Sequence, residues 1–244
     1  MSISIIVPST STSPRFESAV ARRLAGSVVS RTTPAERDQM YALFETYFAG
    51  TNRERFEGDL AEKDGVILLR DGSRICGFST FMWIDDRDVV AFFSGDTIVD
   101  RDYWGETVLS RMWAQIAFAR ADRTDKKVYW FLICSGYKTW RFLPVFFREF
   151  YPHPDTPTPA HMQGLIDALG TRKFGDQYMD GIVRFHNATP LRHGVAEITE
   201  ERLRDPQIAF FARMNPGHVN GDELACITEV SRANLTRAGQ RMIR

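Results

Sequence analysis

Cysteine is scarce in this chain, and the three that it has stand far apart. They are Cys76, Cys134 and Cys226 among 244 residues. No two of them have the spacing of a metal-binding knuckle or a redox pair, so a disulfide framework is not expected. Free cysteines are typical of a reducing compartment, and we therefore predict a cytoplasmic protein. The five histidines also lack metal-ligand spacing, so no metal is expected.

Long apolar runs and an excess of one charge are lacking as well. No stretch approaches the roughly 18 apolar residues that a membrane span requires. The opening segment Met1–Pro8 has neither the basic region nor the long apolar core of a secretory signal. The 31 basic residues balance the 31 acidic ones, whereas nucleic-acid-binding proteins usually carry a basic excess or stripe. We therefore expect neither a membrane nor a nucleic acid as a partner.

The first part of the chain predicts a flexible arm followed by two helices. A tract rich in Ser, Thr and Pro marks residues 1–25 as the arm. Thr33, Pro34 and Glu36 form a capping-box pattern, with the cap, a proline at the first helical position and a glutamate three residues after the cap. A second helix is expected over Arg53–Glu62.

From residue 64 the pattern changes to extended runs. Three strands are predicted, over Val66–Arg70, Ile75–Ile84 and Val89–Val99. The turn-forming stretches Asp71-Gly72 and Asp85–Asp88 separate them. Two successive hairpins of this kind predict an antiparallel meander.

A helix and a central strand follow the meander. The helix is predicted from about Gly105 to Arg123, and Val128–Cys134 is apolar on both faces, as is typical of a strand flanked by helices. Tyr137–Phe150 is predicted to be helical, with an interruption or restart at Pro144. Further along we expect a helix from Thr158 to about Leu169, a strand over Gly181–Phe185, a helix over Thr199–Arg204, an apolar patch over Ile208–Phe211, and either a strand or a buried turn over Asp222–Ile227.

This order of elements resembles the GNAT superfamily of acyl-CoA-dependent N-acyltransferases over roughly residues 26 to 185. Three local patterns carry the resemblance: Arg74–Phe78, Thr97–Gly105 and Arg148–Pro152. The resemblance implies an α+β fold with a mixed, mostly antiparallel central sheet flanked by helices, in which the fourth and fifth strands are parallel and splayed. It also implies an acyltransferase domain over 26–187 and a C-terminal extension over 188–244 packed on that domain.

The resemblance implies transfer of an acyl group from CoA, or from an acyl-carrier protein, to an amine that attacks the thioester directly. Acetyl-CoA or a longer acyl-CoA is then the co-substrate, and a small-molecule amine is the acceptor. The helix after the fourth strand would attract the pyrophosphate with its free N–H groups and positive dipole end. The residues implied in cofactor binding are Ile98, Val99, Arg101, Trp104, Gly105, Glu106 and Thr107. The acceptor, the acyl length, the type of donor and a homodimer are left open.

The phosphate loop departs from the family's pattern. Asp102 stands where the family has a basic or amide residue, and Glu106 adds a second negative charge. Gly105 is retained, and Arg101 is the candidate that compensates for the acidic residues. A tight turn into a core helix is the alternative interpretation of Gly105. Phe146 falls at the position of the family's helix-four tyrosine.

The candidate catalytic residues lie at the ends of the two central strands. The resemblance implies Asp96 as the general base, because the family often places its base late in the fourth strand, and an acidic side chain in an otherwise apolar strand is costly to bury unless it is paired. Gly95 beside it predicts a bulge that splays the strands. Tyr137 is the candidate acid, and Ser135 would bond the thiolate or cap the next helix. The alternatives are a solvent-facing or backbone-bonded Asp96, and a Cys134 that serves only packing.

Two further features, and the function itself, have alternative interpretations. Asn215–Glu223 is interpreted as a loop that closes the C-terminal extension, unless His218, Asp222 and Glu223 face the central cleft, where they would select the acceptor amine. The aromatic run from Trp140 to Tyr151 is either a buried helix face or a tunnel for a fatty acyl chain. The second hypothesis for the whole chain is a GNAT-shaped scaffold that has lost catalysis and binds an apolar ligand or a partner protein.

Overall fold

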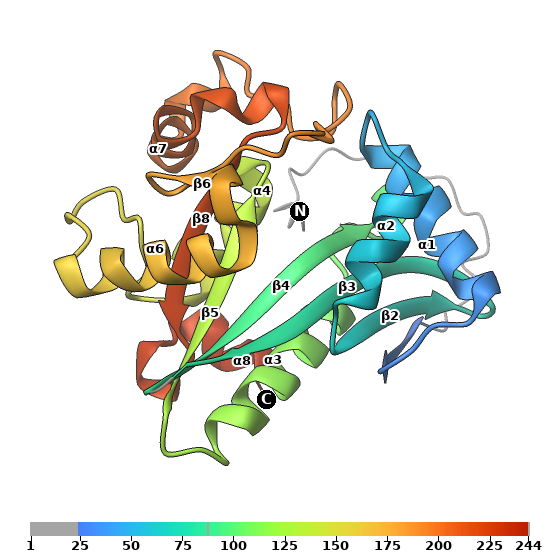
Figure 1. Ribbon diagram of the computed structural model, residues 1–244, viewed down its shortest axis with the longest axis horizontal. Helices are drawn as coiled ribbons and strands as arrows, with labels where there is room; N and C mark the ends of the chain where they lie inside the picture. Colours follow the sequence, from blue (N-terminus) through green and yellow to red (C-terminus); the bar gives the residue numbers. More distant parts are fainter. Residues whose placement is uncertain (1–23, 87, 244) are drawn as a thin grey trace, which may run out of the picture.

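The computed structural model describes residues 24–86 and 88–243, whose strands form one mixed sheet with the order β1-β2-β3-β4-β5-β8-β7-β6 (Figure 1). The strands are β1 Leu24–Val29, β2 Gly65–Asp71, β3 Arg74–Asp85, β4 Val89–Val99, β5 Lys127–Cys134, β6 Tyr178–Met179, β7 Ile182–Val183 and β8 Glu223–Glu229. The helices are α1 Pro34–Tyr47, α2 Arg53–Ala61, α3 Val108–Ala121, α4 Tyr137–Trp140, α5 Phe142–Phe146, α6 Ala160–Phe174, α7 Pro206–Met214 and α8 Arg237–Met242. The arm predicted for residues 1–25 lies outside the described residues except for Leu24 and Ala25, which begin β1.

Strands β2, β3 and β4 form the antiparallel meander predicted from the turn signals. Asp71 pairs with Arg74 at the tip of the first hairpin, and Gly72 between them has a φ of 61°, a conformation that glycine adopts without steric cost. β4 then pairs with β5 in parallel, with α3 as the connection between them. This parallel pair within a mostly antiparallel sheet confirms the expected fold class.

β8 lies inside the sheet rather than at its margin. It is antiparallel to β5 on one side and to β7 on the other. The domain boundary expected between residues 187 and 188 therefore falls within one continuous sheet, and the segment 188–244 contributes a strand to it as well as packing on it. Asp222–Ile227, for which strand and buried turn were both open, is a strand from Glu223 onward.

Helices cover both faces of the sheet (Figure 1). On one face, α1 and α2 bury side chains such as Phe44 and Phe56 against the meander, and α6 buries Ile166 against β5 and β8. On the other face, α3 and α5 enclose an aromatic core that includes Trp113 and Phe147. On the first face, the hydrophobic core under α1 and α2 is separate from the core under α6. The middle of the sheet lies between these two cores.

Several helix predictions differ from the structure in their bounds, and the helix expected over Thr199–Arg204 is a short 3₁₀ helix over Arg202–Arg204. The helix expected over Tyr137–Phe150 is two short helices, and the break falls at Arg141 rather than at Pro144. Pro144 is the third residue of α5, where its missing N–H costs no helical hydrogen bond. α6 extends to Phe174, five residues beyond the expected end. No helix in the described part of the chain combines the length and apolar character that crossing a membrane requires.

The capping box predicted at the start of α1 is present. The Thr33 hydroxyl accepts a hydrogen bond from the Glu36 N–H at 3.3 Å, and the Glu36 carboxylate accepts one from the Thr33 N–H at 2.6 Å. Thr33→Ala removes one of these two bonds, and we expect it to lower the free energy of unfolding by about 1 kcal/mol. Chemical denaturation measures this change, with Thr32→Ala as the matched control, because the Thr32 hydroxyl makes no hydrogen bond to a described residue. An equal loss in both variants would contradict the role of the cap.

Candidate functional site

The sheet splits between β4 and β5. Their parallel register ends at the pair Ser94 and Leu132. Beyond it, Ile133 and Cys134 continue to pair with β8, whereas residues 97–99 continue to pair with β3. The two strands therefore diverge beside residue 96, as the sequence predicted.

A bulge in β4 marks the point of divergence. Ser79 pairs with Thr97 and Phe81 pairs with Ser94, so β4 carries one more residue than β3 between these pairs. The extra residue falls at Gly95 or Asp96. A side chain on Gly95 would come within 2.6 Å of Thr80 Oγ1, so glycine is required for the strands to approach as they do. The prediction of a bulge at Gly95 is confirmed.

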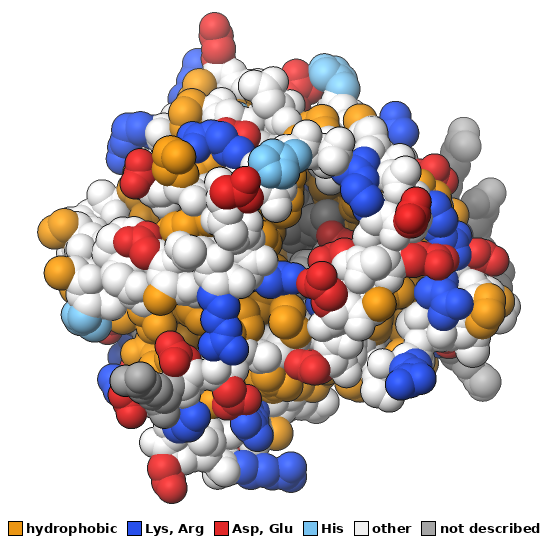
Figure 2. All heavy atoms as spheres, in the orientation of Figure 1, with side chains coloured by type: hydrophobic (Ala, Val, Ile, Leu, Met, Phe, Trp, Pro, Cys, Tyr) orange, Lys and Arg blue, Asp and Glu red, His pale blue; other side chains and the backbone are white. Residues whose placement is uncertain are grey.

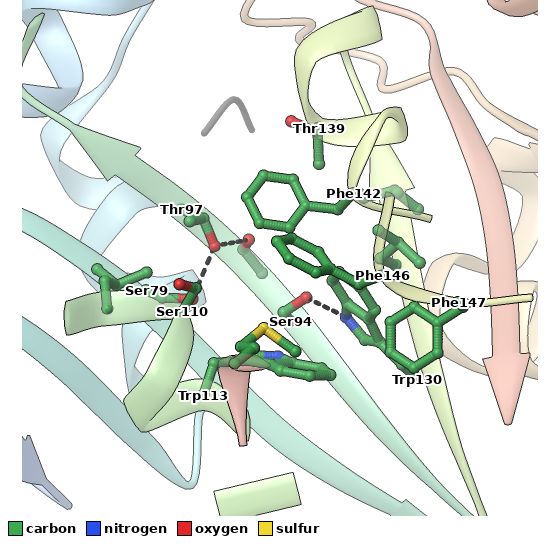
Figure 3. A pocket seen from close by; sticks show the side chains of 15 residues that line it. Ser79, Ser94, Thr97, Ser110, Trp113, Trp130, Thr139, Phe142, Phe146 and Phe147 are labelled. Atoms are coloured by element: carbon green, nitrogen blue, oxygen red, sulfur yellow. Dashed lines mark hydrogen bonds between the residues drawn. The ribbon is translucent and has the colours of Figure 1, made fainter. Parts of the chain in front are cut away.

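A narrow cavity of about 30 Å³ lies on the α3 side of the split. Its wall is mostly aromatic, and the rings of Trp113, Trp130, Phe142, Phe146 and Phe147 surround it (Figure 3). A cavity of this volume holds about two water molecules. The aromatic run expected to be either a buried helix face or a tunnel is therefore buried, and part of it lines a small cavity.

Hydroxyl groups lie at the end of this cavity nearest the split. Ser94 Oγ accepts a hydrogen bond from Trp130 Nε1 at 2.7 Å, and Ser79 and Thr97 share one at 2.7 Å (Figure 3). Thr139 and Trp113 also line the cavity, but Thr139 Oγ1 and Trp113 Nε1 are buried without a hydrogen-bond partner in the described part of the chain. Such orphaned groups favour a bound polar ligand or water at this place.

A wider cleft of about 450 Å³ lies on the opposite face of the sheet, between α2 and the end of α6. Figure 2 shows this face hollowed near its centre, with acidic and basic side chains around the opening. Gly95 and Ile133 line both the cleft and the narrow cavity. The two spaces are therefore back to back across the split in the sheet.

Asp96 lines the cleft at the split. Its side chain is half-buried and makes no hydrogen bond or ion pair with a residue that the structure describes. Burial raises the pKa of Asp96 to about 6, the carboxylate of Asp59 raises it further, and the ammonium group of Lys63 lowers it. A carboxyl group with a pKa near neutrality is suited to accept a proton from a bound amine.

The residues implied in cofactor binding lie around the start of α3. Gly105, Glu106 and Thr107 are exposed, and Gly105 has a φ of 100°, which favours glycine. Thr107 precedes α3 without a side-chain cap, and the backbone N–H groups of the first turn make no hydrogen bond to a described residue. These N–H groups are free to bind an anion.

Trp104 covers the last residues of β4. Its Nε1 donates a hydrogen bond to the Val99 carbonyl at 2.9 Å. Ile98 and Val99 are buried and pair with β3. The Val99 carbonyl, which lies beside the gap in the sheet, is therefore already bonded, and a ligand arm along this edge would have to displace the indole or pair elsewhere.

Two cations lie over the ring of Trp104, and a third, Arg202, acts on one of them electrostatically from its place beside Tyr137. Lys138 Nζ lies 3.8 Å from the centre of the indole ring, and the Arg101 guanidinium lies 5.3 Å from it. Arg202 binds the Tyr137 hydroxyl and the Glu197 carbonyl. Burial lowers the pKa of Lys138 to about 8, and the charges of Arg202 and Arg101 lower it further.

These three cations form no ion pair with an acidic side chain in the described part of the chain. A bound anion would offset the electrostatic repulsion between Lys138 and the two guanidinium groups. The sequence analysis named Arg101 but missed Lys138 and Arg202, because Arg202 lies about a hundred residues from the loop and no local pattern marks either cation.

Tyr137 and Ser135 follow the end of β5. The Tyr137 side chain is buried, its hydroxyl accepts a hydrogen bond from Arg202, and burial raises its pKa. Ser135 Oγ is buried and has no hydrogen-bond partner among the described residues. Neither residue lines the narrow cavity or the cleft. Their catalytic roles stay predictions.

The C-terminal residues proposed to select the acceptor separate into two groups. Glu223 lines the cleft. Asp222 forms an ion pair with Arg184 at 3.1 Å, and His218 packs on the ring of Phe211. No group of three or more His, Cys, Asp or Glu side chains in the described segments is arranged to hold a metal. Cys76, Cys134 and Cys226 are buried and free.

No family model matches the sequence, and no curated protein matches it either. Among solved structures, it is similar to the GNAT family N-acetyltransferase YhbS from Escherichia coli in complex with CoA. The identity is 17%, the similarity covers 55% of this chain and 71% of that chain, and the TM-score is 0.37. It is also similar to N-acetylglutamate synthase from Neisseria gonorrhoeae, complexed with coenzyme A and N-acetyl-glutamate. Here the identity is 9%, the similarity covers 85% of this chain and 36% of that chain, and the TM-score is 0.41.

A third similar structure is an aminoglycoside acetyltransferase from an uncultured soil metagenomic sample in complex with sisomicin. The identity is 14%, over 44% of this chain and 76% of that chain, with a TM-score of 0.35. The sheet itself, with a parallel β4–β5 pair that opens at Gly95 inside a mostly antiparallel arrangement, has the GNAT-like α+β fold class expected from the sequence.

Proposed function

We propose that this chain transfers an acyl group from acyl-CoA to the amine of a small molecule. The observation that supports the proposal is the meeting of the two spaces at Gly95 and Ile133. A thioester that arrives from the α3 side and an amine that arrives from the cleft would come together at the split in the sheet. Holding the two reactants in this way removes the entropic cost of a bimolecular encounter.

Asp96 is the proposed general base. The neutral amine attacks the thioester carbonyl carbon, and Asp96 takes the proton that the nitrogen loses as the carbon–nitrogen bond forms. The carbon–sulfur bond then breaks, and the thiolate leaves with the electron pair. Tyr137 is the proposed source of the proton for the thiolate, and Arg202 would stabilise the phenolate that remains.

The cations beside Trp104 are the proposed partners of the donor's phosphates. The phosphate loop itself carries Asp102 and Glu106, which disfavour an anion. Lys138 and Arg101 lie over Trp104, in the loop that leads into α3, and would supply the positive charge that the loop lacks. Ile98, Val99, Gly105 and Thr107 remain proposed contacts of the donor through their backbone.

The narrow cavity limits how the donor arm enters. At about 30 Å³ it is too small for a pantetheine arm or an acyl chain, so the side chain of Phe142 or Phe146 has to turn away on binding. The orphaned Thr139 Oγ1 and Trp113 Nε1 fit a polar arm at this place. The narrowness itself favours the second candidate, a GNAT-shaped scaffold without catalysis, and activity measurements separate the two.

Calorimetry with acetyl-CoA and longer acyl-CoAs tests the proposed donor. We expect Lys138→Met to weaken CoA binding about tenfold or more, because an ionic hydrogen bond to phosphate contributes about 1.5–3 kcal/mol. Lys127→Met is the matched control, since Lys127 lies at the other end of β5 and is paired with Glu229. Binding of no acyl-CoA would exclude CoA as the donor, and tight binding of phosphopantetheine alone would favour an acyl-carrier protein.

A further inference from the structure

The charged groups around the cleft are mostly paired with one another. Asp59 pairs with Lys63 at 2.5 Å, and Glu62 pairs with Lys173 at 2.6 Å. Arg55 donates to the backbone carbonyls of Asn187 and Gly50. Two carboxylates of the cleft, Asp96 and Glu223, are left without a hydrogen bond or ion pair to any residue in the described part of the chain. Of the charged side chains that line the cleft, four are acidic and three are basic, and the two acidic groups at the split, Asp96 and Glu223, have no cationic partner among the described residues.

Glu223 is the more buried of the two carboxylates. It is the first residue of β8, its exposed fraction is 8%, and it lines the cleft. Its neighbour Leu224 pairs with Cys134, so Glu223 lies just beyond the end of β5, on the far side of the gap from Asp96. Burying a carboxyl group without a partner is costly, and folding alone gives no reason for glutamate here.

The apolar part of the cleft wall is mostly aromatic. Phe44, Phe56, Phe93, Phe174 and Phe185 line it, and Lys173 Nζ already lies 5.9 Å from the ring of Phe93. Aromatic faces attract cations and also bury apolar surface. The volume of about 450 Å³ is typical of a small-molecule site.

We infer that the cleft binds an acceptor that combines an ammonium group with an aromatic or apolar body and carries no carboxylate of its own, and that Glu223 holds its ammonium group. This inference rests on the proposed function for the identity of the cleft as the acceptor site. Glu223 binds the ammonium group and takes the first proton, which leaves the neutral amine, and Asp96 at the split takes the second proton as the carbon–nitrogen bond forms. An α-amino acid is disfavoured, because a carboxylate next to its ammonium group would lie beside Glu223 and Asp96 at the split.

Binding measured without any acyl donor tests the inference separately from acyl transfer. The probes are phenethylamine and phenylalanine, which differ only by a carboxylate. Calorimetry on the full chain is expected to detect phenethylamine and to give at least about tenfold weaker binding of phenylalanine. Glu223→Gln is expected to weaken phenethylamine binding about tenfold or more.

The control is Glu229→Gln, on the same strand but at its far end and paired with Lys127, and it should leave binding unchanged. Wild-type affinity for phenethylamine should also rise between about pH 6 and pH 8, as Glu223 and Asp96 lose their protons beside Asp59 and Lys63, and Glu223→Gln should reduce that rise. Equal binding of the two probes, binding of neither, or unchanged binding in Glu223→Gln overturns the inference. None of these results affects CoA binding, which tests the proposed function.

Discussion

Asp96→Asn is expected to lower kcat/KM for acyl transfer by about 10²–10⁴-fold while acyl-CoA binding stays as in the wild type. The asparagine side chain has nearly the shape of aspartate but cannot accept the proton that the amine loses. Because burial raises the pKa of Asp96 to about 6, the wild-type rate should climb as the pH rises through that value. The rate of the variant should not show this rise with pH. Release of free thiol from acyl-CoA in the presence of phenethylamine measures the rate.

Asp88→Asn is the matched control for this variant. Asp88 is exposed and directly precedes the opposite end of β4, far from the split. Its replacement should leave both the rate and the pH profile unchanged. A full rate in Asp96→Asn, with the fold intact by circular dichroism, would remove Asp96 as the base. A wild-type protein that transfers no acyl group to any amine would instead support the scaffold without catalysis.

The sequence predicts those parts of the fold whose signals are local. The capping box at Thr33, the turn at Gly72 and the doubly apolar run of β5 each lie within a few residues, and the structure has them where expected. Gly95 beside Asp96 was enough to predict the bulge, since a glycine next to a carboxylate in an apolar strand weakens regular pairing at that point.

The features that the sequence could not settle depend on contacts between distant residues. β8 has only seven residues, and a run of that length fits a strand or a buried turn equally well until its partners are known. Its place between β5 and β7 determines that Glu223 lies in the cleft opposite Asp96, 127 positions earlier in the chain. The positions of Lys138 over Trp104 and of Arg202 over Tyr137 likewise depend on contacts between distant residues.

The pH dependence of stability is expected to show that Glu223 is held in the cleft without a partner. Burial raises the pKa of Glu223 from 4.5 to about 7, with smaller contributions from Asp96 and Asp59. The folded state then binds the proton more tightly than the unfolded state does. Below about pH 4 Glu223 is protonated in both states, so it does not lower the free energy of unfolding. As the pH rises from there to about 7, the free energy of unfolding falls, and it stays low above that value. A shift of this size corresponds to a loss on the order of 3 kcal/mol.

Glu223→Gln should flatten this decline, because glutamine does not titrate. The slope of the unfolding free energy with pH is the informative quantity, since a buried amide without a partner has its own cost of about 1–3 kcal/mol at every pH. Urea denaturation between about pH 4 and pH 8 measures the slope, and Glu229→Gln should reproduce the wild-type curve. A decline that is unchanged in Glu223→Gln would mean that Glu223 is solvated or paired. A steeper decline would mean that its carboxylate stabilises the fold, and either result would leave the cleft with no unsatisfied negative charge at Glu223 to hold an ammonium group.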